Sequence, residues 1–389
     1  MILLYDQPAF TSTAIPMTNQ HPRICIFAPS FGDGGVERML VNLATQFSTR
    51  GIIVDLIVNN QNSGYLKNLP GSIHLPALAG IPRKDYTDFL LNYFTESKPD
   101  IILSSKPEDD RVVRQAKLRT DHPVRFFIRC PTAILSRMKL RRENLLKTWL
   151  KKRGLKKSFM GADGIIAVSK CVADEVNELI SDKQQKIIAI KNPNITPELR
   201  TLASQEITHP WFQTDSPPAI LGIGGFRKQK DFSTLIRAFA LVKAKLDSRL
   251  VILGQGRQKK RLQKLIDKLN MTDFVDLHGF VENPYPFTAN ADLFVLSSLW
   301  EGSPNVLTEA LALGTAVVST NCHCGPAEIL QNGQYGELVA LQDPEHLSEA
   351  ILKTLNDPLP AETLREAARD YTLQASADAY LQAFGLDNL

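Results

Sequence analysis

The chain has 389 residues, more than an ordinary single domain needs, so we expect two domains. Hydrophobic residues make up 43% and charged residues 22% of it, which is typical of globular proteins and excludes collagen-like, coiled-coil and wholly disordered chains. The net charge of +4 is unevenly distributed: residues 1–200 carry 29 Lys and Arg against 19 Asp and Glu, and the remainder carries 16 against 22. The basic N-terminal half indicates a partner surface rich in phosphate.

The N-terminal residues and the cysteines bear on location. Residues 1–22 are polar, contain proline and lack the basic start of a signal peptide, so we expect a loose leader. The five cysteines are scattered, and no run of about 20 apolar residues exists, so we expect reduced thiols in a cytoplasmic protein without a membrane span. Cys322-His323-Cys324 has no second ligand pair nearby, and neighbouring ligands rarely chelate one zinc ion, so no metal site is predicted.

Strand and helix signals alternate from residue 23 onward. An apolar strand at 23–28 precedes the turn Phe31-Gly32-Asp33-Gly34-Gly35. A helix follows, with apolar residues at helical spacing from Val36 to Phe47, and then a strand at 52–58. Further strands are predicted at 101–103, 125–128, 164–168 and 186–190. This alternation indicates a parallel-sheet α/β domain.

A strongly basic segment covers residues 137–157, where 10 of 21 residues are Lys or Arg and one is acidic. Apolar side chains are interleaved with the cations: Leu140, Leu145, Leu146, Trp149 and Leu150. Such a segment can lie on an anionic membrane, and we favour this interpretation, which places the protein peripherally at the inner face of a membrane. A solvated helix packed on its domain is the alternative. Nucleic acid is not expected as a partner, because no recognition motif accompanies the cations.

The second half begins with residues 194–218, which are rich in Pro, Thr and Ser and form the best candidate linker. Strands are then predicted at 219–223, 249–253, 275–277, 293–296 and 316–319, and helices at 231–246, 257–270, 305–313 and 344–356. We expect two Rossmann-like domains facing a central cleft, at 23–197 and 198–370, and a C-terminal helix at 371–389 that packs back on the first domain. Parallel sheets bind ligands at the carboxyl ends of their strands.

The strongest chemical pattern surrounds two glutamates. Glu301 precedes the predicted helix and Glu309 lies within it, so the two cannot share one helical stripe and are expected to address different parts of one ligand. Pro304 suits the first turn of a helix. The N–H groups that follow would then point out of the helix end and suit a diphosphate; they belong to Asn305, Val306 and Leu307. A helix-terminal charge and a surface glutamate explain the pattern equally well.

A basic glycine turn follows the strand at 219–223. Arg227 and Lys230 could neutralise a departing nucleotide diphosphate, although a solvated basic turn would have the same composition. The earlier turn at 31–35 lacks the G-x-G-x-x-G arrangement, which argues against a nicotinamide dehydrogenase. Arg129, at a predicted strand end, could bind an acceptor phosphate or cap a surface turn.

Residues 293–328 resemble the family 4 glycosyltransferases, whose signature is two glutamates separated by seven residues after a strand. The matching text is WEGSPNVLTEALALGTAVVST followed by CGPAEIL, and similarity extends from SFGDGGVERMLVNLA to NGQYGELVALQDPEHLSEAI. The resemblance implies a GT-B fold and a retaining transfer from a nucleotide-sugar, with a UDP-sugar favoured. It implies no cofactor, and the absence of an Asp-x-Asp metal site leads us to expect no metal requirement.

The resemblance also implies roles for individual residues. Glu301 and Lys230 would be catalytic, with Glu301 on the donor sugar and Lys230 on the leaving diphosphate, and Glu309 would bind the ribose. The rest of the donor site would comprise Gly34, Gly35, Arg227, Gly254, Val281, Gly302, Ser303, Asn305, Val306 and Leu307. The family usually has arginine where Gly225 stands, and Arg227 or Lys228 could reach the same phosphates instead.

The expected acceptor is a glycan or lipid-linked saccharide of the cell envelope, because of the basic segment. Arg129 is the acceptor-side candidate. Two other functions stay open: a nucleotide-sugar epimerase of the same fold, and a non-catalytic member that binds a nucleotide-sugar, which the glycine at position 225 would suit.

Overall fold

The computed structural model describes residues 21–32, 34–67, 69–141, 144–180, 185–213 and 215–387. The expected leader at 1–22 lies almost entirely outside these residues. The chain forms two compact units. The first unit comprises the residues up to Pro193 together with those from Leu373 onward, and the second unit comprises Asn194–Thr372.

The first unit is built on a parallel seven-stranded sheet with the order β3-β2-β1-β4-β5-β6-β7. Its strands are short and mostly buried, as expected where helices cover both faces of a parallel sheet. The strands are β1 (Arg23–Phe27), β2 (Ile53–Ile57), β3 (Ile73–His74), β4 (Ile101–Ser104), β5 (Arg125–Cys130), β6 (Gly164–Ala167) and β7 (Ile187–Ala189).

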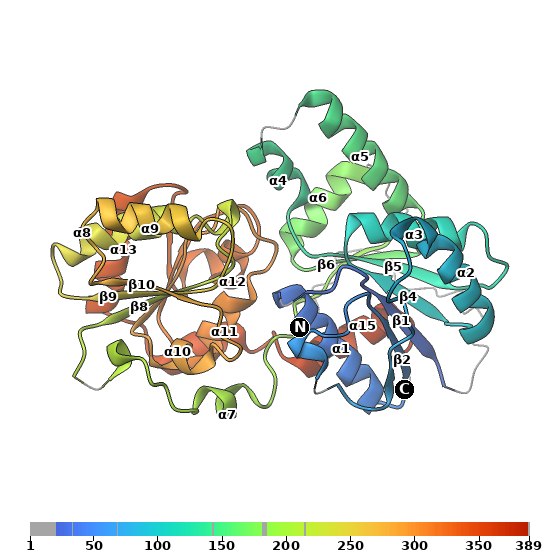
Figure 1. The fold of residues 1–389 in the computed structure, drawn as a ribbon, viewed down its shortest axis with the longest axis horizontal. Coiled ribbons are helices and arrows are strands. Elements are labelled where there is room, and N and C mark those ends of the chain that lie inside the picture. The colour runs from blue at the N-terminus through green and yellow to red at the C-terminus, as the bar shows by residue number, and fades with distance from the viewer. Residues whose placement is uncertain are drawn as a thin grey trace. The chain divides into compact units, whose positions relative to one another are not determined.

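Seven helices of the first unit are described, and they pack on the two faces of this sheet (Figure 1). One layer contains α1 (Gly35–Thr49) and α15 (Leu373–Ala383). The other layer contains α2 (Tyr86–Ser97), α3 (Pro107–Lys117), α4 (Ile134–Arg141), α5 (Leu145–Met160) and α6 (Lys170–Ile180).

The second unit contains a parallel six-stranded sheet with the order β10-β9-β8-β11-β12-β13. Its strands are β8 (Ala219–Ile223), β9 (Arg249–Leu253), β10 (Val275–Gly279), β11 (Leu293–Leu296), β12 (Val317–Thr320) and β13 (Glu337–Val339). Its helices are α7 (Leu199–Ala203), α8 (Phe232–Lys243), α9 (Lys259–Lys268), α10 (Tyr285–Asn290), α11 (Asn305–Leu313), α12 (Pro326–Ile329), α13 (Pro344–Asn356) and α14 (Ala361–Ala368). Both units are therefore Rossmann-like, as predicted.

The predicted helices at 305–313 and 344–356 coincide with α11 and α13. The end of α11 follows from its sequence, because Gly314 adopts the left-handed conformation, at φ +83°, that stops a helix. Two strands were not predicted, β3 and β13, since runs of two and three residues are too short to show a periodic pattern.

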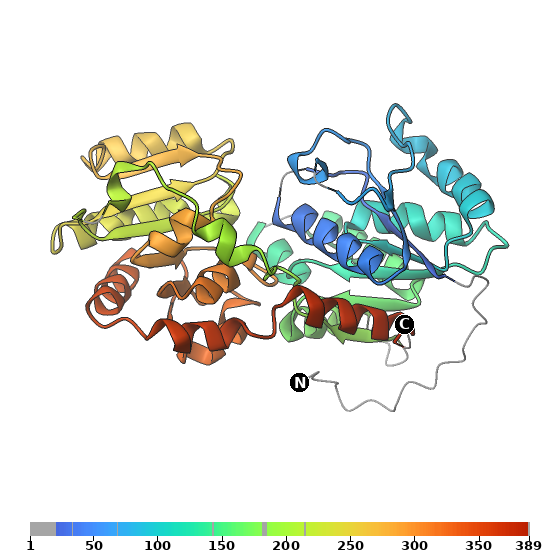
Figure 2. The ribbon, with the colours of Figure 1, turned by 90° about the horizontal axis from the view of Figure 1, so that it is seen from below.

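The C-terminal helix belongs to the core of the first unit. The ring of Phe384 lies 4.7 Å from that of Phe127 and 6.1 Å from that of Phe47, centroid to centroid. Tyr380 of α15 is buried in the same cluster. Figure 2 shows α15, drawn in red, running beside the strands of this unit. The first unit is thus completed by residues that follow the second unit in the chain.

The segment at 194–218 differs from the expected linker. It contains α7, and Leu199 and Ala203 are buried in the core of the second unit. Asn194 also donates hydrogen bonds from Nδ2 to the Asn305 carbonyl and to Thr308 Oγ1 at the start of α11. Proline and serine are frequent here because the segment winds over the surface of the unit, and it is nonetheless a packed part of that unit.

Candidate functional site

The strand order places a ligand site in the second unit. Its sheet grows from β8 toward β10 on one side and resumes with β11 on the other. Ligands of such sheets bind at this switch point, beyond the carboxyl ends of the two central strands. The two loops there are joined by hydrogen bonds, from the Leu299 N–H to the Gln229 carbonyl at 2.7 Å and from Ser297 Oγ to the Lys230 carbonyl at 2.7 Å.

The switch point brings the two predicted catalytic residues together. Lys230, in the short 3-10 helix Lys228–Lys230, places Nζ 2.6 Å from Oε1 of Glu301. Ser298 Oγ donates to the same Oε1 at 2.7 Å, and Gln229 Nε2 lies 3.4 Å from Oε2. The side chains of Lys230 and Glu301 are only 18% and 9% exposed. A carboxylate and an ammonium are therefore held in fixed positions at the edge of the sheet.

A thiol that the sequence pattern did not reveal lies beside this pair. Cys322 follows β12 and is buried. Burial raises the pKa of its thiol well above the usual value, the negative charge of Glu301 raises that pKa further, and Lys230 lowers it. The Cys322 thiol is therefore neutral at physiological pH. It places an uncharged, polarisable group beside the Lys230–Glu301 pair.

Glycines leave room for the lysine. A Cβ atom at Gly224, where φ is +154°, would lie 2.9 Å from Cε of Lys230. A Cβ atom at Gly254, where φ is +146°, would lie 2.0 Å from the Gly224 carbonyl oxygen. The loops after β8 and β9 thus touch backbone to backbone, which only glycine permits.

The side chain of Arg227 lies next to Gly225. A Cβ atom at Gly225 would lie 3.1 Å from Nε of Arg227. The guanidinium of Arg227 therefore lies across the space in which a side chain at position 225 would begin. Arg227 itself is exposed to solvent.

The start of α11 follows the predicted pattern with one correction. Pro304 is the N-cap residue and Asn305 the first helical residue. The prediction that the Leu307 N–H points freely out of the helix end is wrong, because it donates to the Pro304 carbonyl at 3.0 Å within the first turn. Asn305 and Val306 are half-buried.

The segment between Glu301 and α11 is held by a second glycine contact. A Cβ atom at Gly325, where φ is +97°, would lie 2.7 Å from Cδ of Pro304 and 3.2 Å from the Gly302 carbonyl. Gly302 is buried and Ser303 half-buried. The CGPAE segment therefore supports the loop that carries Gly302 and Ser303.

The other predicted donor residues of the second unit lie in the same layer of loops or in α11. Glu309 is 2% exposed and lies one helical turn after Asn305. Gly254 directly follows β9, next to Gly224. Val281 follows the edge strand β10 and packs in part against the core.

The predicted residues of the first unit have other surroundings. Gly34 is the N-cap of α1 and Gly35 its first residue, and both are exposed; Asp33 lies outside the described residues. Arg129 is buried in β5, with NH2 2.7 Å from Oδ1 of Asn192 and NH1 3.4 Å from Oγ of Ser105. The guanidinium of Arg129 is thus buried near the carboxyl end of β5, and its Nε has no hydrogen-bond partner in the described residues.

A charged cluster that the sequence analysis missed lies at the switch point of the first sheet, between β1 and β4. Lys106, two residues beyond the end of β4, donates to Oε1 of Glu37 at 2.9 Å and to the Ser30 carbonyl. Arg83 NH2 lies 2.9 Å from Oδ1 of Asp109. The available signal was a lysine in the loop that follows a predicted strand, since parallel strands present the loops after them at one edge of the sheet.

The basic segment forms parts of two helices, α4 and α5, and residues 142–143 within it are outside the described chain. Leu146 and Trp149 are 65% and 54% exposed, and Leu150 is similar. Arg153 stacks on the Trp149 ring, 5.5 Å from its centroid. The opposite face of α5 is buried through Leu155 and Phe159, so the exposed face combines apolar and cationic side chains. Among the described residues, no helix is both long and apolar enough to cross a membrane.

Three metal-ligating side chains of the second unit gather at β10. Oδ2 of Asp276 lies 3.1 Å from Nε2 of His209 and 2.9 Å from Nδ1 of His278. Nδ1 of His209 accepts the Trp211 N–H at 3.2 Å, so its Nε2 carries the proton that is donated to Asp276. A protonated nitrogen offers no lone pair to a metal, and hydrogen bonding accounts for this trio.

Two family models match the chain. The model for Glycosyltransferase Family 4 matches residues 33–193, and the model for Glycosyl transferases group 1 matches residues 204–371. Together they cover most of both units.

Curated relatives carry related names. An uncharacterized glycosyltransferase of Methanocaldococcus jannaschii is 47% identical over 28% of this chain and 27% of its own length. A Campylobacter jejuni N-acetylgalactosamine-N,N'-diacetylbacillosaminyl-diphospho-undecaprenol 4-alpha-N-acetylgalactosaminyltransferase is 27% identical over 86% of this chain and 90% of its own. The Rhizobium meliloti lipopolysaccharide core biosynthesis glycosyltransferase LpsE is 26% identical over 90% of this chain and 95% of its own length.

A solved structure confirms the architecture. Anabaena Alr3699/HepE, crystallised in complex with UDP-glucose, superposes with a TM-score of 0.77 at 17% identity, over 95% of this chain and 100% of that one. The Rossmann-like units, the two matching models and the full-length relatives agree, and the chain belongs to the glycosyltransferases of the GT-B fold, of the family 4 and group 1 type.

Proposed function

We propose that the protein transfers a sugar from a nucleotide-sugar, with a UDP-sugar favoured, to a glycan or lipid-linked saccharide of the cell envelope, with retention of configuration. The observation that carries this proposal is the Lys230–Glu301 ion pair of 2.6 Å at the switch point of the second sheet, next to the start of α11. The names of the Campylobacter and Rhizobium relatives support the acceptor class, and the UDP-glucose complex of HepE supports the donor class.

The leaving group is the nucleoside diphosphate. When the bond between the anomeric carbon and the diphosphate oxygen breaks, negative charge develops on that oxygen. Lys230, Arg227 and the amides at the start of α11 would neutralise it, and such preorganised charge is often the largest contribution to catalysis. The acceptor oxygen bonds to the anomeric carbon on the face from which the diphosphate departs, and its proton passes to the diphosphate.

Glu301 would hold the transferred sugar. Its Oε1 is engaged by Lys230 and Ser298, whereas within the described part of the chain Oε2 has only the 3.4 Å contact with Gln229. Oε2 is therefore the oxygen with capacity to accept a hydroxyl of the sugar.

The remaining donor contacts are proposals of the same kind. Glu309 would bind the ribose from the helix face it shares with Asn305. Gly254 and Val281 would line the base, Gly302 and Ser303 the phosphates, and Gly34 and Gly35 the phosphates from the first unit. Arg227 would serve in place of the arginine that the family usually has at position 225.

We propose that no divalent metal takes part, because Lys230 and Arg227 supply the charge that a metal would otherwise supply. Transfer is expected to proceed unchanged in excess EDTA, measured as nucleotide released per minute. Loss of activity in EDTA that added magnesium or manganese restores would refute this part of the proposal.

We propose further that the exposed face of α5 rests on an anionic membrane at the cytoplasmic side. Leu146, Trp149 and Leu150 would enter the interface, while neighbouring lysines meet the headgroups, each adding about 1 kcal/mol. This contact would bring the active site to acceptors held on lipid. Replacing Lys147 and Lys151 by glutamate should abolish sedimentation with vesicles containing phosphatidylglycerol, and vesicles of neutral lipid serve as the control.

The catalytic proposal is tested with the double variant Glu301→Ala, Lys230→Ala, compared with Lys264→Ala on the exposed face of α9 as a matched control. A thermal-shift screen of nucleotide-sugars first identifies the donor, because a ligand of the folded state raises the melting temperature. The double variant should lose transfer, and the control should keep it. Nucleotide release by the double variant at the wild-type rate would overturn the mechanism.

The same assay separates the two other functions. An isomerised sugar after incubation with donor alone would identify an epimerase. Donor binding without turnover across a broad acceptor panel would identify a non-catalytic member.

A further inference from the structure

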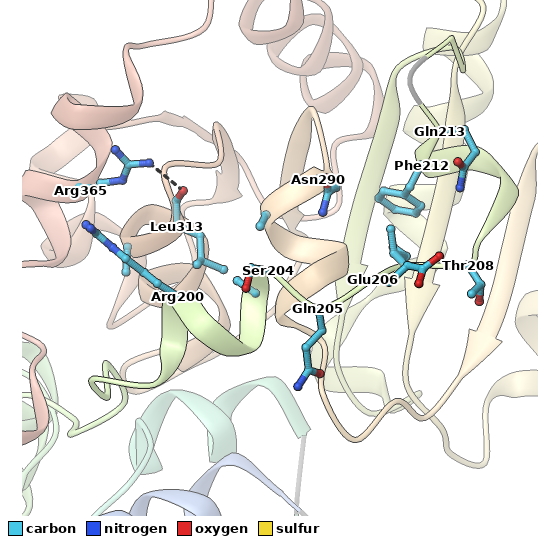
Figure 3. Close-up of a pocket in the computed structure, with 14 residues that line it drawn as sticks. Arg200, Ser204, Gln205, Glu206, Thr208, Phe212, Gln213, Asn290, Leu313 and Arg365 are labelled. Carbon is cyan, nitrogen blue, oxygen red and sulfur yellow. Dashed lines mark hydrogen bonds between the residues drawn. The ribbon is translucent and has the colours of Figure 1, made fainter.

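A pocket of about 840 Å³ lies on the second unit, away from the switch point (Figure 3). One wall is α7 with the residues that follow it, and the other is formed by the ends of α10 and α11 together with Arg365 of α14. α11 has 9 residues, so at about 1.5 Å per residue its two ends are about 12 Å apart. The donor site lies at the first end of α11 and this pocket at the last, so the two sites are separate.

Two guanidinium groups lie at one end of the pocket, those of Arg200 and Arg365, as Figure 3 shows. The Arg200 side chain is exposed, and no hydrogen bond or ion pair to it is found within the described residues. Arg365 bonds through NH1 to Glu362, and its NH2 contact with the Leu313 carbonyl is long, at 3.4 Å. Its Nε is buried and has no hydrogen-bond partner in the described structure, so the N–H groups open to a ligand are those of its terminal nitrogens. Both groups thus retain donors for an anion.

The rest of the lining mixes polar and apolar side chains. It offers hydroxyl and amide groups from Ser204, Gln205, Thr208, Gln213 and Asn290. Asn290 uses Nδ2 on the Pro286 carbonyl, which leaves its side-chain oxygen as an acceptor. Figure 3 shows Phe212 and Glu206 toward the end opposite the arginines. The other lining side chains are apolar: Ala203, Ile207, Ala289, Ala312 and Leu313.

We propose that this pocket binds a saccharide that carries one acidic group. Its carboxylate or phosphate would lie between Arg200 and Arg365, because guanidinium groups recognise such oxygens with paired hydrogen bonds. Its hydroxyls would pair with the amides and with Glu206, and a sugar ring would rest on Phe212. The volume falls within the range of about 300–1,000 Å³ found for ligand pockets. Glu206 disfavours a ligand that is anionic along its whole length.

This site is additional to the proposed donor and acceptor sites. Acidic saccharides come from two sources, namely soluble sugar phosphates and uronic acid units of a polysaccharide. Titration calorimetry of the full chain, with the donor site saturated by the nucleotide that the thermal-shift screen selects, distinguishes them. The probes are glucose 6-phosphate, a disaccharide of one glucuronic acid and one glucose, maltotriose as the neutral saccharide, and inorganic phosphate.

One acidic saccharide should bind about tenfold more tightly than maltotriose and inorganic phosphate, which corresponds to one charge-assisted hydrogen bond. Arg200→Ala should weaken that binding about tenfold. Arg237→Ala, an exposed arginine of α8 outside the pocket, should leave it unchanged. Arg200 is the decisive position, since Arg365 also contacts the end of α11 and its loss could disturb the fold.

Equal affinity for maltotriose, equal affinity for inorganic phosphate, or an unchanged affinity in Arg200→Ala would each overturn the proposal. Sugar transfer is measured on the same Arg200→Ala protein and should stay within twofold of the wild type. Because binding at the pocket is read without turnover, a failure of this proposal is distinguishable from a failure of the proposed transfer reaction.

Discussion

The two units share one topology, and they use it differently. In each sheet the chain first builds outward from a central strand and then resumes on that strand's other side, which leaves a switch point between β1 and β4 and another between β8 and β11. In the second unit this place holds one nearly buried ion pair, Lys230 with Glu301. In the first unit it holds two pairs whose cations are more open, with Lys106 28% and Arg83 47% exposed.

The difference teaches that topology fixes where a ligand can bind, whereas local packing determines which ligand is bound. Close glycine contacts compress the loops of the second unit around Lys230 and Glu301, which suits one constant ligand portion such as a nucleotide diphosphate. The more exposed cations of the first unit, Lys106 and Arg83, suit a ligand whose negative charge stays in contact with solvent. Four experiments test this contrast between the two units.

The largest effect is expected from Lys230→Ala. Loss of the cation beside the leaving diphosphate should lower kcat about 10²- to 10³-fold, or about 3–4 kcal/mol. Lys106→Ala, at the equivalent place in the first unit, should leave nucleotide affinity within twofold and change the acceptor KM instead. Steady-state kinetics with both substrates varied checks this. If Lys106→Ala weakened nucleotide binding as much as Lys230→Ala, the contrast between the two switch points would fail.

A smaller effect, on stability, is expected from Gly254→Ala. The new Cβ atom would lie 2.0 Å from the Gly224 carbonyl oxygen at a positive φ, so the loops after β8 and β9 would have to separate. Overpacking and strain together should lower the free energy of unfolding by about 3 kcal/mol. Gly71→Ala in the first unit, where no atom lies within 4 Å, is the control and should change stability little. Urea unfolding of both variants measures the difference, and equal midpoints would show that the loop contact is not tight.

Asp109 should make the stability of the first unit depend on pH. Burial raises the pKa of its carboxyl to about 6 from the ordinary 3.8, and Arg83 opposes that shift. The folded chain therefore binds this proton more tightly than the unfolded chain, so stability falls as the pH rises from about 4 to about 6 and stays low above that range. The loss should be about 2–3 kcal/mol.

Asp109→Asn removes this titration. The variant should show a flatter dependence of unfolding free energy on pH between about 4 and 6, because the amide carries no ionisable proton. Urea unfolding at several pH values checks it, with the second-unit variant Asp273→Asn as the control. The same pH dependence in Asp109→Asn and in the wild type would contradict the assignment.

The smallest effect is expected from Ser298→Ala. Ser298 touches neither sugar nor phosphate in the proposed mechanism and acts by orienting Glu301 through the 2.7 Å hydrogen bond. Its loss should lower kcat about tenfold and leave nucleotide affinity unchanged. In a Glu301→Gln background the same change should cost little, and a double-mutant cycle measures that coupling. Additive effects would mean that Ser298 acts on something other than Glu301.

The sequence predicted the elements around Glu301 and Glu309 because their signals are local. Glu301, Pro304 and the apolar face of α11 lie within a few residues of one another, and the helix ends where expected at Leu313. Lys230 lies 71 positions from Glu301, yet each lies in the loop that follows a predicted strand, and a parallel sheet brings such loops to one edge.

The site of the first unit was less predictable because its pairs join residues far apart in the chain. Nothing near Lys106 indicates Glu37, 69 positions away, and nothing near Arg83 indicates Asp109. Arg129 was expected at an exposed strand end, but β5 continues through Cys130, so the arginine is buried. The boundary of a strand decides whether its last side chain faces solvent, and apolar periodicity does not fix that boundary to one residue.

The return of α15 to the first unit has a consequence for the order of folding during synthesis. The second unit is one continuous stretch and has all its residues once Thr372 has left the ribosome. The first unit, although translated earlier, lacks the rings of Tyr380 and Phe384 until the residues after Leu373 emerge. Until then Phe47 and Phe127 face an unfilled side of its core. The unit that is begun first is therefore the last to be completed, and a chain truncated after Thr372 should show a protease-resistant second unit beside a cleavable first one.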